Sequence, residues 1–305
     1  MDAVITYVDG NDPVWRKDYE DFANVSLLAK RFRDWGTLKY LLRGIESCMP
    51  FIENVYLVVS HESQVPDWAD KENLKIVLHK DIIPERYLPV FNSTAIEMFL
   101  HRIEGLDERY VYFNDDMFPV RKCSETDLFR DGCAVIGMAR HLLASGMYKV
   151  QCRNSDRLAR RAAGKPSSMF FVRPQHICSP MLKSECEILY GIVEKEISAS
   201  ISRIREAGNL NQYLYLDFMY HRGRLIPEKI SNRHFSVAVA SARTLEDFIM
   251  NPDRSFCCIN DVRLKEEKFQ ELQKAVVAAF EKRFPEKSRF ERYDEDRCCY
   301  YMGRR

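Results

Sequence analysis

The chain has 305 residues, of which 46% are apolar and 30% charged, and its 46 Lys and Arg residues nearly balance its 45 Asp and Glu residues. This is ordinary globular composition, which excludes disordered, collagen-like and coiled-coil chains. The length suggests one large domain or two closely joined ones. A net charge of +1 argues against a nucleic-acid-binding protein, because the phosphates of such a partner call for a basic excess.

The sequence also indicates a cytoplasmic location. No apolar run approaches the ~20 residues of a membrane span, and the first residues lack the basic start and long apolar run of a signal peptide. Ten cysteines are scattered without the paired spacing of a zinc site. We therefore expect reduced thiols in a cytoplasmic protein.

In chain order, short apolar runs predict strands, and apolar residues spaced three and four apart predict helices. The predicted strands cover residues 3–8, 54–59, 74–78 and 110–113, and the predicted helices between them cover 38–45 and 93–103, the latter capped by Ser93. Strands that alternate with helices predict an α/β fold with a Rossmann-like, mostly parallel sheet and helices on both faces. In such a sheet, ligands bind at the carboxyl ends of the strands.

The second half of the chain follows a different pattern. Basic and small residues dominate 140–174, where we expect loops or a flap, and helical patterns return at 183–205, 211–222 and 265–283. No repeat or flexible linker marks a boundary. We therefore expect a single domain over residues 1–305, with a Rossmann-like part at 1–139 and a mainly helical part at 140–305.

The sharpest chemical feature is Asn114-Asp115-Asp116, which directly follows a predicted strand. Two carboxylates beside an amide at the end of a strand suit Mg²⁺ or Mn²⁺, which prefer oxygen ligands and often share phosphate oxygens. The alternative is a solvated turn in which these side chains satisfy backbone donors. The spacing leaves both interpretations open.

Two further segments are candidates for ligand binding. The first predicted strand ends in the turn from Asp9 through Gly10 to Asp12, where glycine permits a close approach to a ligand, although this is also a good plain turn. Three arginines, Arg31, Arg33 and Arg43, offer the planar guanidinium that binds phosphate through two hydrogen bonds, although surface ion pairs are the alternative. One of the seven histidines is the natural general base near neutral pH, yet a single histidine is more often structural.

Four separated blocks match a known family in order and together frame nearly the whole chain. The blocks comprise residues 2–13; 31–45 with 66–68, 88–93 and 109–118; 176–205 with 211–213; and 258–261 with 284–291. They resemble the Stealth family, the hexose-1-phosphate transferases of capsular polysaccharide synthesis. The catalytic part of the animal lysosomal-enzyme N-acetylglucosamine-1-phosphotransferase belongs to the same family. Two departures stand out: Asp9 replaces the commoner Asn, and the proline that follows His176 comes later than usual.

The resemblance implies a single catalytic domain in which residues 1–139 form the nucleotide-sugar part and residues 140–305 complete the site. It implies that the enzyme moves a hexose 1-phosphate from a UDP-hexose to the hydroxyl of a glycan or sugar acceptor and releases UMP, with N-acetylglucosamine 1-phosphate as the expected group. It implies that Asp115 and Asp116 bind Mg²⁺ or Mn²⁺, that His176 is the base, and that Arg205 neutralises the phosphoryl oxygens. Asp12 joins the implied catalytic group. The implied donor-binding residues are Asp9, Gly10, Arg33, Arg43, Asn92 and Asn114.

Two rival functions remain at this stage. An ordinary metal-dependent glycosyltransferase would attack the anomeric carbon and release UDP, and a non-catalytic carbohydrate-binding module would form no nucleotide product. The compact length favours a bacterial cytoplasmic enzyme, and the basic segment 153–165 could mediate peripheral membrane association or form a solvated or acceptor-binding loop. The hexose, the acceptor, the oligomeric state and the roles of Asn260 and Asp261 stay open.

Overall fold

A five-stranded sheet forms the centre of the molecule. The computed structural model describes residues 1–23, 32–262 and 264–292. The strands are β1 (Asp2–Thr6), β2 (Asn54–Val59), β3 (Leu74–Leu78), β4 (Arg109–Asn114) and β10 (Ser179–Leu182), in the order β10-β4-β1-β2-β3. The first four are parallel and β10 is antiparallel to β4. The predicted α/β class with a mostly parallel sheet is confirmed.

The register of the sheet brings two chemically rich turns together. Thr6, the last residue of β1, pairs with Asn114, the last residue of β4. Because parallel strands end at the same edge, the chain leaving β1 and the chain leaving β4 emerge side by side. The residues from Tyr7 onward and the pair Asp115-Asp116 therefore share one end of the sheet.

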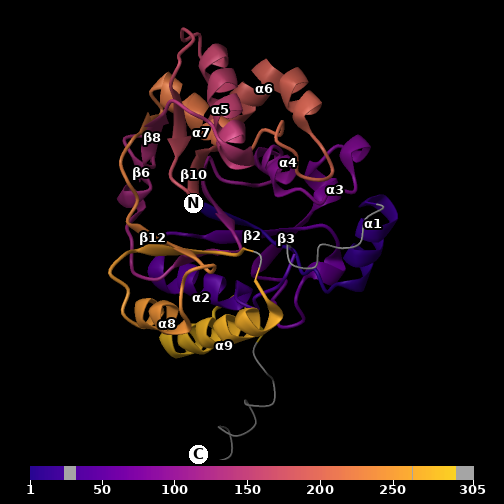
Figure 1. Cartoon of the computed structure of the whole chain (residues 1–305), viewed down its shortest axis with the longest axis vertical. Coiled ribbons are helices and arrows are strands. Elements are labelled where there is room, and N and C mark those ends of the chain that lie inside the picture. Colours follow the sequence, from indigo (N-terminus) through magenta and orange to yellow (C-terminus); the bar gives the residue numbers. More distant parts are fainter. Residues whose placement is uncertain (24–31, 263, 293–305) are drawn as a thin grey trace, which may run out of the picture.

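Helices flank the sheet in Figure 1, where α2, α8 and α9 lie on one side of the strands and α3 to α7 on the other. Helix α2 buries Leu38, Leu41, Leu42 and Ile45, as the apolar spacing predicts. The nine helices of the described residues are α1 (Pro13–Ala23), α2 (Leu38–Cys48), α3 (His79–Ile82), α4 (Ser93–Glu97), α5 (Gly146–Ala162), α6 (Lys183–Ser200), α7 (Tyr213–Arg222), α8 (Ala242–Met250) and α9 (Glu266–Arg283).

Smaller sheets surround the central one. Their orders are β11-β7-β6, β12-β13-β5 and β8-β9. These strands are β5 (Met117–Pro119), β6 (Phe129–Arg130), β7 (Cys133–Val135), β8 (Met138–His141), β9 (Phe171–Pro174), β11 (Leu225–Ile226), β12 (Asn232–Ser236) and β13 (Phe256–Asn260). Short 3₁₀ helices cover Glu62–Gln64, Glu85–Tyr87, Leu100–Arg102 and Glu125–Asp127. Strand β13 matters most for the site, because it delivers Asn260 and Asp261.

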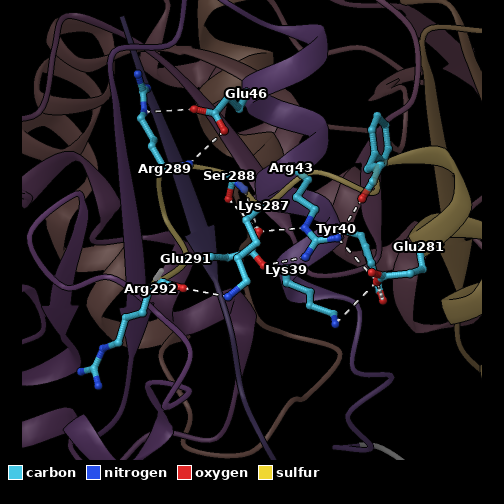
Figure 2. A network of polar contacts seen from close by, with 11 residues as sticks. Lys39, Tyr40, Arg43, Glu46, Glu281, Lys287, Ser288, Arg289, Glu291 and Arg292 are labelled. Carbon is cyan, nitrogen blue, oxygen red and sulfur yellow. Dashed lines mark hydrogen bonds and ion pairs between the residues drawn. The ribbon is translucent and has the colours of Figure 1, made fainter. Parts of the chain in front are cut away.

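A buried ion pair fastens the end of the described chain to helix α2 (Figure 2). Arg43 donates from Nε to Glu291 Oε1 and from Nη2 to Glu291 Oε2, both at 2.8 Å. Its third nitrogen, Nη1, donates to the carbonyl of Phe284 at 2.7 Å. Glu291 also accepts hydrogen bonds from the backbone nitrogen and hydroxyl of Ser288. Every nitrogen of the buried guanidinium therefore has an acceptor.

Three expectations about local structure are wrong. Residues 146–162 form helix α5 instead of a flap, because its buried face is made of small and polar residues that leave no apolar stripe: Gln151, Cys152, Ser155, Asp156 and Ala159. The helix predicted at 93–103 ends at Glu97, and Asn92 caps it in place of Ser93 by accepting from the backbone nitrogen of Thr94. The helix predicted at 183–205 ends at Ser200.

The cysteines of the described residues are free thiols, and six of the eight are buried. Cys298 and Cys299 lie outside the described residues, as does Arg31. The division of the chain at residue 139 stays a prediction, since the second half contains strands β9 to β13 as well as helices α5 to α9.

Candidate active site

A cavity of about 390 Å³ opens at the carboxyl edge of the central sheet. It collects residues from distant parts of the chain: the end of β1, the segment before α2, the start of α4, the turn after β4 and the end of β13. Its polar and ionisable lining includes Thr6, Tyr7, Arg33, Asp34, Asn92, Asn114, Asp115, Asp116, His176, Arg205, Asn260 and Asp261. The cavity therefore holds acids, bases and cations in one place.

Three carboxylates converge because two strands meet behind them. The backbone nitrogen of Ile259 donates to the carbonyl of Asp116 at 2.9 Å, which ties the end of β13 to the turn after β4. The thiol of Cys258 donates to Asp116 Oδ2 at 3.4 Å, and the indole nitrogen of Trp35 donates to Asp261 Oδ2 at 3.0 Å. These contacts bring Asp261 to the side of Asp115 and Asp116.

This carboxylate group has the electrostatics of a cation site. Burial, followed by repulsion from Asp116 and Asp34, raises the pKa of Asp115 to about 8. Burial also raises the pKa of Asp116 to about 6 and raises the pKa of Asp261. Asp116 Oδ1 and Asp261 Oδ1 are buried without a hydrogen-bond partner. Unpaired oxygens on mutually repelling carboxylates fit a hard divalent cation such as Mg²⁺ or Mn²⁺.

A fourth acid extends this negative region toward β1. Burial raises the pKa of Asp34, and Asp9 nearby adds to the increase. The hydroxyl of Tyr7 lies against the Asp34 carboxylate, and burial with the surrounding acids raises the pKa of Tyr7 far above its usual value. Tyr7 therefore stays protonated and acts as a hydrogen-bond donor inside the cavity.

His176 is held as a neutral imidazole. Its Nδ1 lies 2.9 Å from the hydroxyl of Tyr213, which in turn lies 2.9 Å from the hydroxyl of Tyr148. Burial, followed by the charges of His234, Arg173 and Arg205, lowers the pKa of His176 to about 4. In the tautomer whose Nδ1–H donates to Tyr213, the other ring nitrogen carries no proton and can accept one.

Arg205 reaches the cavity from the loop after α6, and a hydrogen bond holds its guanidinium in place. Its Nη2 donates to the hydroxyl of Ser93 at the start of α4. Burial raises the pKa of the neighbouring Glu97 to about 7, while the charge of Arg205 opposes that rise. Glu97 accepts from the backbone nitrogen of Gln212 at 3.0 Å and from the hydroxyl of Tyr112 at 3.4 Å. Arg205 is thus a positioned positive charge in the cavity that the carboxylates also line.

Most of the predicted site residues meet at the cavity. Asn114, Asp115, Asp116, His176 and Arg205 line it, although the turn after β4 and the loop after α6 lie far apart in the sequence. Arg33 also lines the cavity, with its guanidinium 4.1 Å from the ring centre of Phe269, and its charge acts on Asp261. Asn260 and Asp261, whose roles the sequence leaves open, line it as well.

Arg43 and Asp12 do not line the cavity, which corrects their predicted roles. Arg43 is buried, and its guanidinium is occupied by Glu291 and the carbonyl of Phe284, so it cannot bind the donor. Asp12 Oδ1 accepts from the backbone nitrogen of Trp15 at 2.7 Å at the start of helix α1. Asp12 is therefore a helix cap, for which aspartate is a preferred residue.

Asp9, Gly10 and Asn92, which were predicted to bind the donor, make contacts within the fold instead. A Cβ at Gly10 would lie 2.0 Å from the carbonyl oxygen of Phe32, so glycine is required there by backbone packing. Asp9 does not line the cavity, and its Oδ1 accepts from the backbone nitrogen of Asn11. Asn92 lines the cavity but is only 1% exposed, with its amide bonded to Ser202, Asn209 and Thr94.

The sequence did not point to Tyr7, Asp34 or Tyr213. Asp34 lies in an irregular segment without a periodic pattern, and Tyr7 and Tyr213 look like ordinary apolar positions at the ends of a strand and a helix. Beside the carboxylates, ring nitrogens of His176 and His234 and the sulfur of Cys258 lie within 4.8 Å of one another. This is a second group of ligand atoms, and its nitrogen and sulfur suit a softer cation.

Comparison with known proteins finds consistent relatives. The family model "Stealth protein CR2, conserved region 2" matches residues 31–135. The capsular polysaccharide phosphotransferase WcwK of Streptococcus pneumoniae is 30% identical, over 96% of this chain and 99% of the relative. The receptor polysaccharide phosphotransferase WefC of Streptococcus oralis is 29% identical, over 95% and 99%.

The likeness to solved structures is weaker. The galactosyltransferase LgtC in complex with donor and acceptor sugar analogs matches with a TM-score of 0.39 and 12% identity, over 90% of this chain and 96% of that one. At that score the likeness carries no argument about fold or function. Within the described residues, none of the helices has the length and apolar character needed to cross a membrane.

Proposed function

Because the chain belongs to the Stealth family and is a phosphotransferase, we propose that it transfers a hexose 1-phosphate from a UDP-hexose to a sugar hydroxyl and releases UMP. The product would enter a capsular or other surface polysaccharide, and N-acetylglucosamine 1-phosphate is the proposed group. One observation carries the proposal: buried carboxylates with two unpartnered oxygens share a cavity with the neutral His176 and with Arg205.

Asp115, Asp116 and Asp261 would hold the divalent cation, which is Mg²⁺ or Mn²⁺ in the proposal. The fit rests on their oxygen chemistry and on the unpaired Oδ1 atoms of Asp116 and Asp261. When bound, the cation supplies positive charge that neutralises the diphosphate and the departing UMP. Without that charge, the acids would repel the donor.

The residues of this chain then have separate tasks. The acceptor hydroxyl attacks the β-phosphorus, its proton passes to the free ring nitrogen of His176, and Tyr213 keeps the ring oriented through Nδ1. A bond forms between the acceptor oxygen and phosphorus, and the bond from phosphorus to the bridging oxygen breaks, so UMP leaves with that oxygen. Arg205 neutralises the non-bridging phosphoryl oxygens, and the bond between sugar and phosphate stays intact.

The cavity offers an apolar end for the nucleoside. Trp15, Phe32 and Phe91 line it, and the rings of Trp15 and Phe32 have centroids 4.7 Å apart. We place the uracil at these aromatic edges and the diphosphate toward Asp115 and Arg33. That the protein acts in the bacterial cytoplasm stays a prediction.

The identity of the released nucleotide tests the proposal. The protein is incubated with UDP-N-acetylglucosamine, Mg²⁺ and a panel of sugar acceptors, and UMP is separated from UDP. Asp115→Asn should lower acceptor-dependent UMP release by at least 100-fold, because one carboxylate charge is lost from the cation site. The exposed Asp131, changed to Asn, is the matched control and should keep full activity.

The outcomes are distinct. Release of UDP in place of UMP would mean attack at the anomeric carbon, and the glycosyltransferase alternative would be adopted. If Asp115→Asn released UMP as fast as the wild type, the assigned cation site would be wrong. Absence of any nucleotide product with every UDP-hexose and acceptor would favour the carbohydrate-binding alternative.

A further inference from the structure

Positive charge is concentrated in one segment of an otherwise balanced protein. Residues 138–173 contain eight Lys and Arg residues and a single acid, Asp156, whereas the whole chain has a net charge of +1. The acid does not offset charge at the surface, because Asp156 is only 1% exposed and pairs with Arg160 and His221. The segment comprises β8, α5, β9 and their connections.

The same segment exposes apolar side chains. Twelve large apolar residues are exposed in the described part of the chain, and six of them lie here: Leu142, Leu143, Met147, Tyr148, Met169 and Phe170. Leu143 is 77% exposed and Met169 is 80% exposed. Such a concentration in about a tenth of the chain indicates a surface that contacts a partner.

The strand register places these side chains next to one another. Strands β8 and β9 pair antiparallel with His141 opposite Phe171, so the chain beyond that pair continues with Leu142 and Leu143 on one side and Phe170 and Met169 on the other. The guanidinium of Arg140 lies 4.9 Å from the ring centre of Phe170. The result is an apolar tip with basic residues around it, which we call the β8–β9 tip.

Several of the surrounding cations are available to a partner. Within the described residues, Arg140, Lys149, Arg153, Arg157 and Lys165 have no carboxylate within ion-pair distance, and Arg140, Arg157 and Lys165 are exposed. In Figure 1, β8 and α5 lie at the end of the molecule opposite α8 and α9. Asp156, the one acid of the segment, is buried, so no exposed carboxylate of the segment repels an anionic partner.

We propose that the β8–β9 tip, together with Arg153 and Arg157 of α5 and Lys165 just beyond it, binds the surface of an anionic lipid bilayer. Exposed apolar side chains that enter the headgroup region, flanked by Lys and Arg, are the combination that peripheral membrane proteins use. A second copy of the same surface fits poorly, because two patches of like charge repel. A nucleic acid would leave the apolar side chains of the tip exposed to water.

The surface lies beside His176, the proposed base. Tyr148, in the first turn of α5, packs against the ring of His176 with centroids 6.1 Å apart, and β9 ends two residues before His176. If the proposed function holds, an acceptor attached to the membrane would meet the base directly. Membrane binding itself does not depend on that reaction.

Co-sedimentation with vesicles tests the proposal without substrate. The wild type should bind vesicles made of equal parts phosphatidylglycerol and phosphatidylcholine, and binding should weaken with salt. Leu143→Glu/Met169→Glu should weaken binding at least tenfold, because the apolar contacts are lost. Arg157→Glu/Lys165→Glu should weaken it at least 25-fold, since each basic residue near such a surface contributes about fivefold.

Two control variants separate the surface from general effects. Val239→Glu changes another highly exposed apolar residue, and Lys274→Glu/Lys282→Glu on α9 makes the same change in net charge. Both should bind like the wild type, and all variants should keep UMP release with a short soluble acceptor. Equal binding to pure phosphatidylcholine, no binding to any vesicle, or equal loss in the controls would overturn the proposal. Dimerisation abolished by Leu143→Glu/Met169→Glu, with no vesicle binding, would assign the surface to a second copy.

Discussion

Replacing Glu291 by Gln tests whether Arg43 is structural. The side chains of Arg43 and Glu291 are 5% and 4% exposed, and the carboxylate accepts from the guanidinium at two points of 2.8 Å. In Glu291→Gln the guanidinium keeps the Phe284 carbonyl and the half-exposed Glu281 at 3.5 Å, but it loses its buried counter-charge, and an amide NH₂ faces one of its donors. Breaking a buried pair in this way costs about 3–5 kcal/mol.

Thermal and urea unfolding measure the stability lost in Glu291→Gln. For a chain of 305 residues, a loss of about 3 kcal/mol should lower the melting temperature by roughly 5 °C and shift the urea midpoint. The double variant Arg43→Met/Glu291→Leu should recover part of that loss, because two apolar side chains need no counter-charge. Recovery should be incomplete, since the backbone nitrogen and hydroxyl of Ser288 still lose their acceptor.

Donor affinity distinguishes the structural role from the donor-binding role that the sequence indicates for Arg43. At a temperature where the variants are folded, Glu291→Gln and the double variant should bind UDP-N-acetylglucosamine within about threefold of the wild type, because Arg43 does not line the cavity. A tenfold loss of donor affinity with less than about 1 kcal/mol lost in stability would refute this reasoning.

Three more predictions follow from the cavity. The pKa of Asp115 is raised to about 8 and that of Asp116 to about 6, both above the values in the unfolded chain. The folded, cation-free protein therefore binds more protons than the unfolded chain, and its stability falls as pH rises from about 4 to 8. Mg²⁺ affinity, measured by calorimetry, should therefore rise by up to about tenfold per unit between pH 6 and 8; a flat profile would contradict it. Tyr213→Phe removes the hydrogen bond to His176 and should lower kcat about tenfold with unchanged donor affinity, whereas an equal loss in both would assign Tyr213 to the donor. Micromolar Zn²⁺ should inhibit through His176 and His234, and His234→Ala should relieve that inhibition while keeping basal activity; persistent inhibition would place Zn²⁺ elsewhere.

The central sheet was predictable because its strands carry their own signals. Apolar runs bounded by turn residues fixed β2 and β3 to the residue, and the alternation with helices implied that parallel strands end at one edge. That edge rule was enough to bring the turns after β1 and β4 together. The pairing of Thr6 with Asn114 shows why a local pattern could locate Asp115.

Other features depend on contacts that no local pattern contains. Helix α5 buries Ser155 and Asp156 against the rest of the fold, so its core face reads as polar. Arg43 looks like a phosphate ligand until Glu291, 248 residues away, is placed against it. Asp34 joins the site because an irregular segment passes over the end of β1. Such a segment lacks the periodic spacing of apolar residues from which helices and strands are predicted.

The fate of the donor's β-phosphate tests the central claim most directly. UDP-N-acetylglucosamine labelled with ³²P at the β-position is incubated with the protein, Mg²⁺ and an acceptor, and the glycan product is separated from the nucleotides. The account predicts that the label moves to the glycan together with the sugar, leaving unlabelled UMP, and that Asp115→Asn abolishes the transfer. Label that stays in UDP while the sugar moves would contradict it.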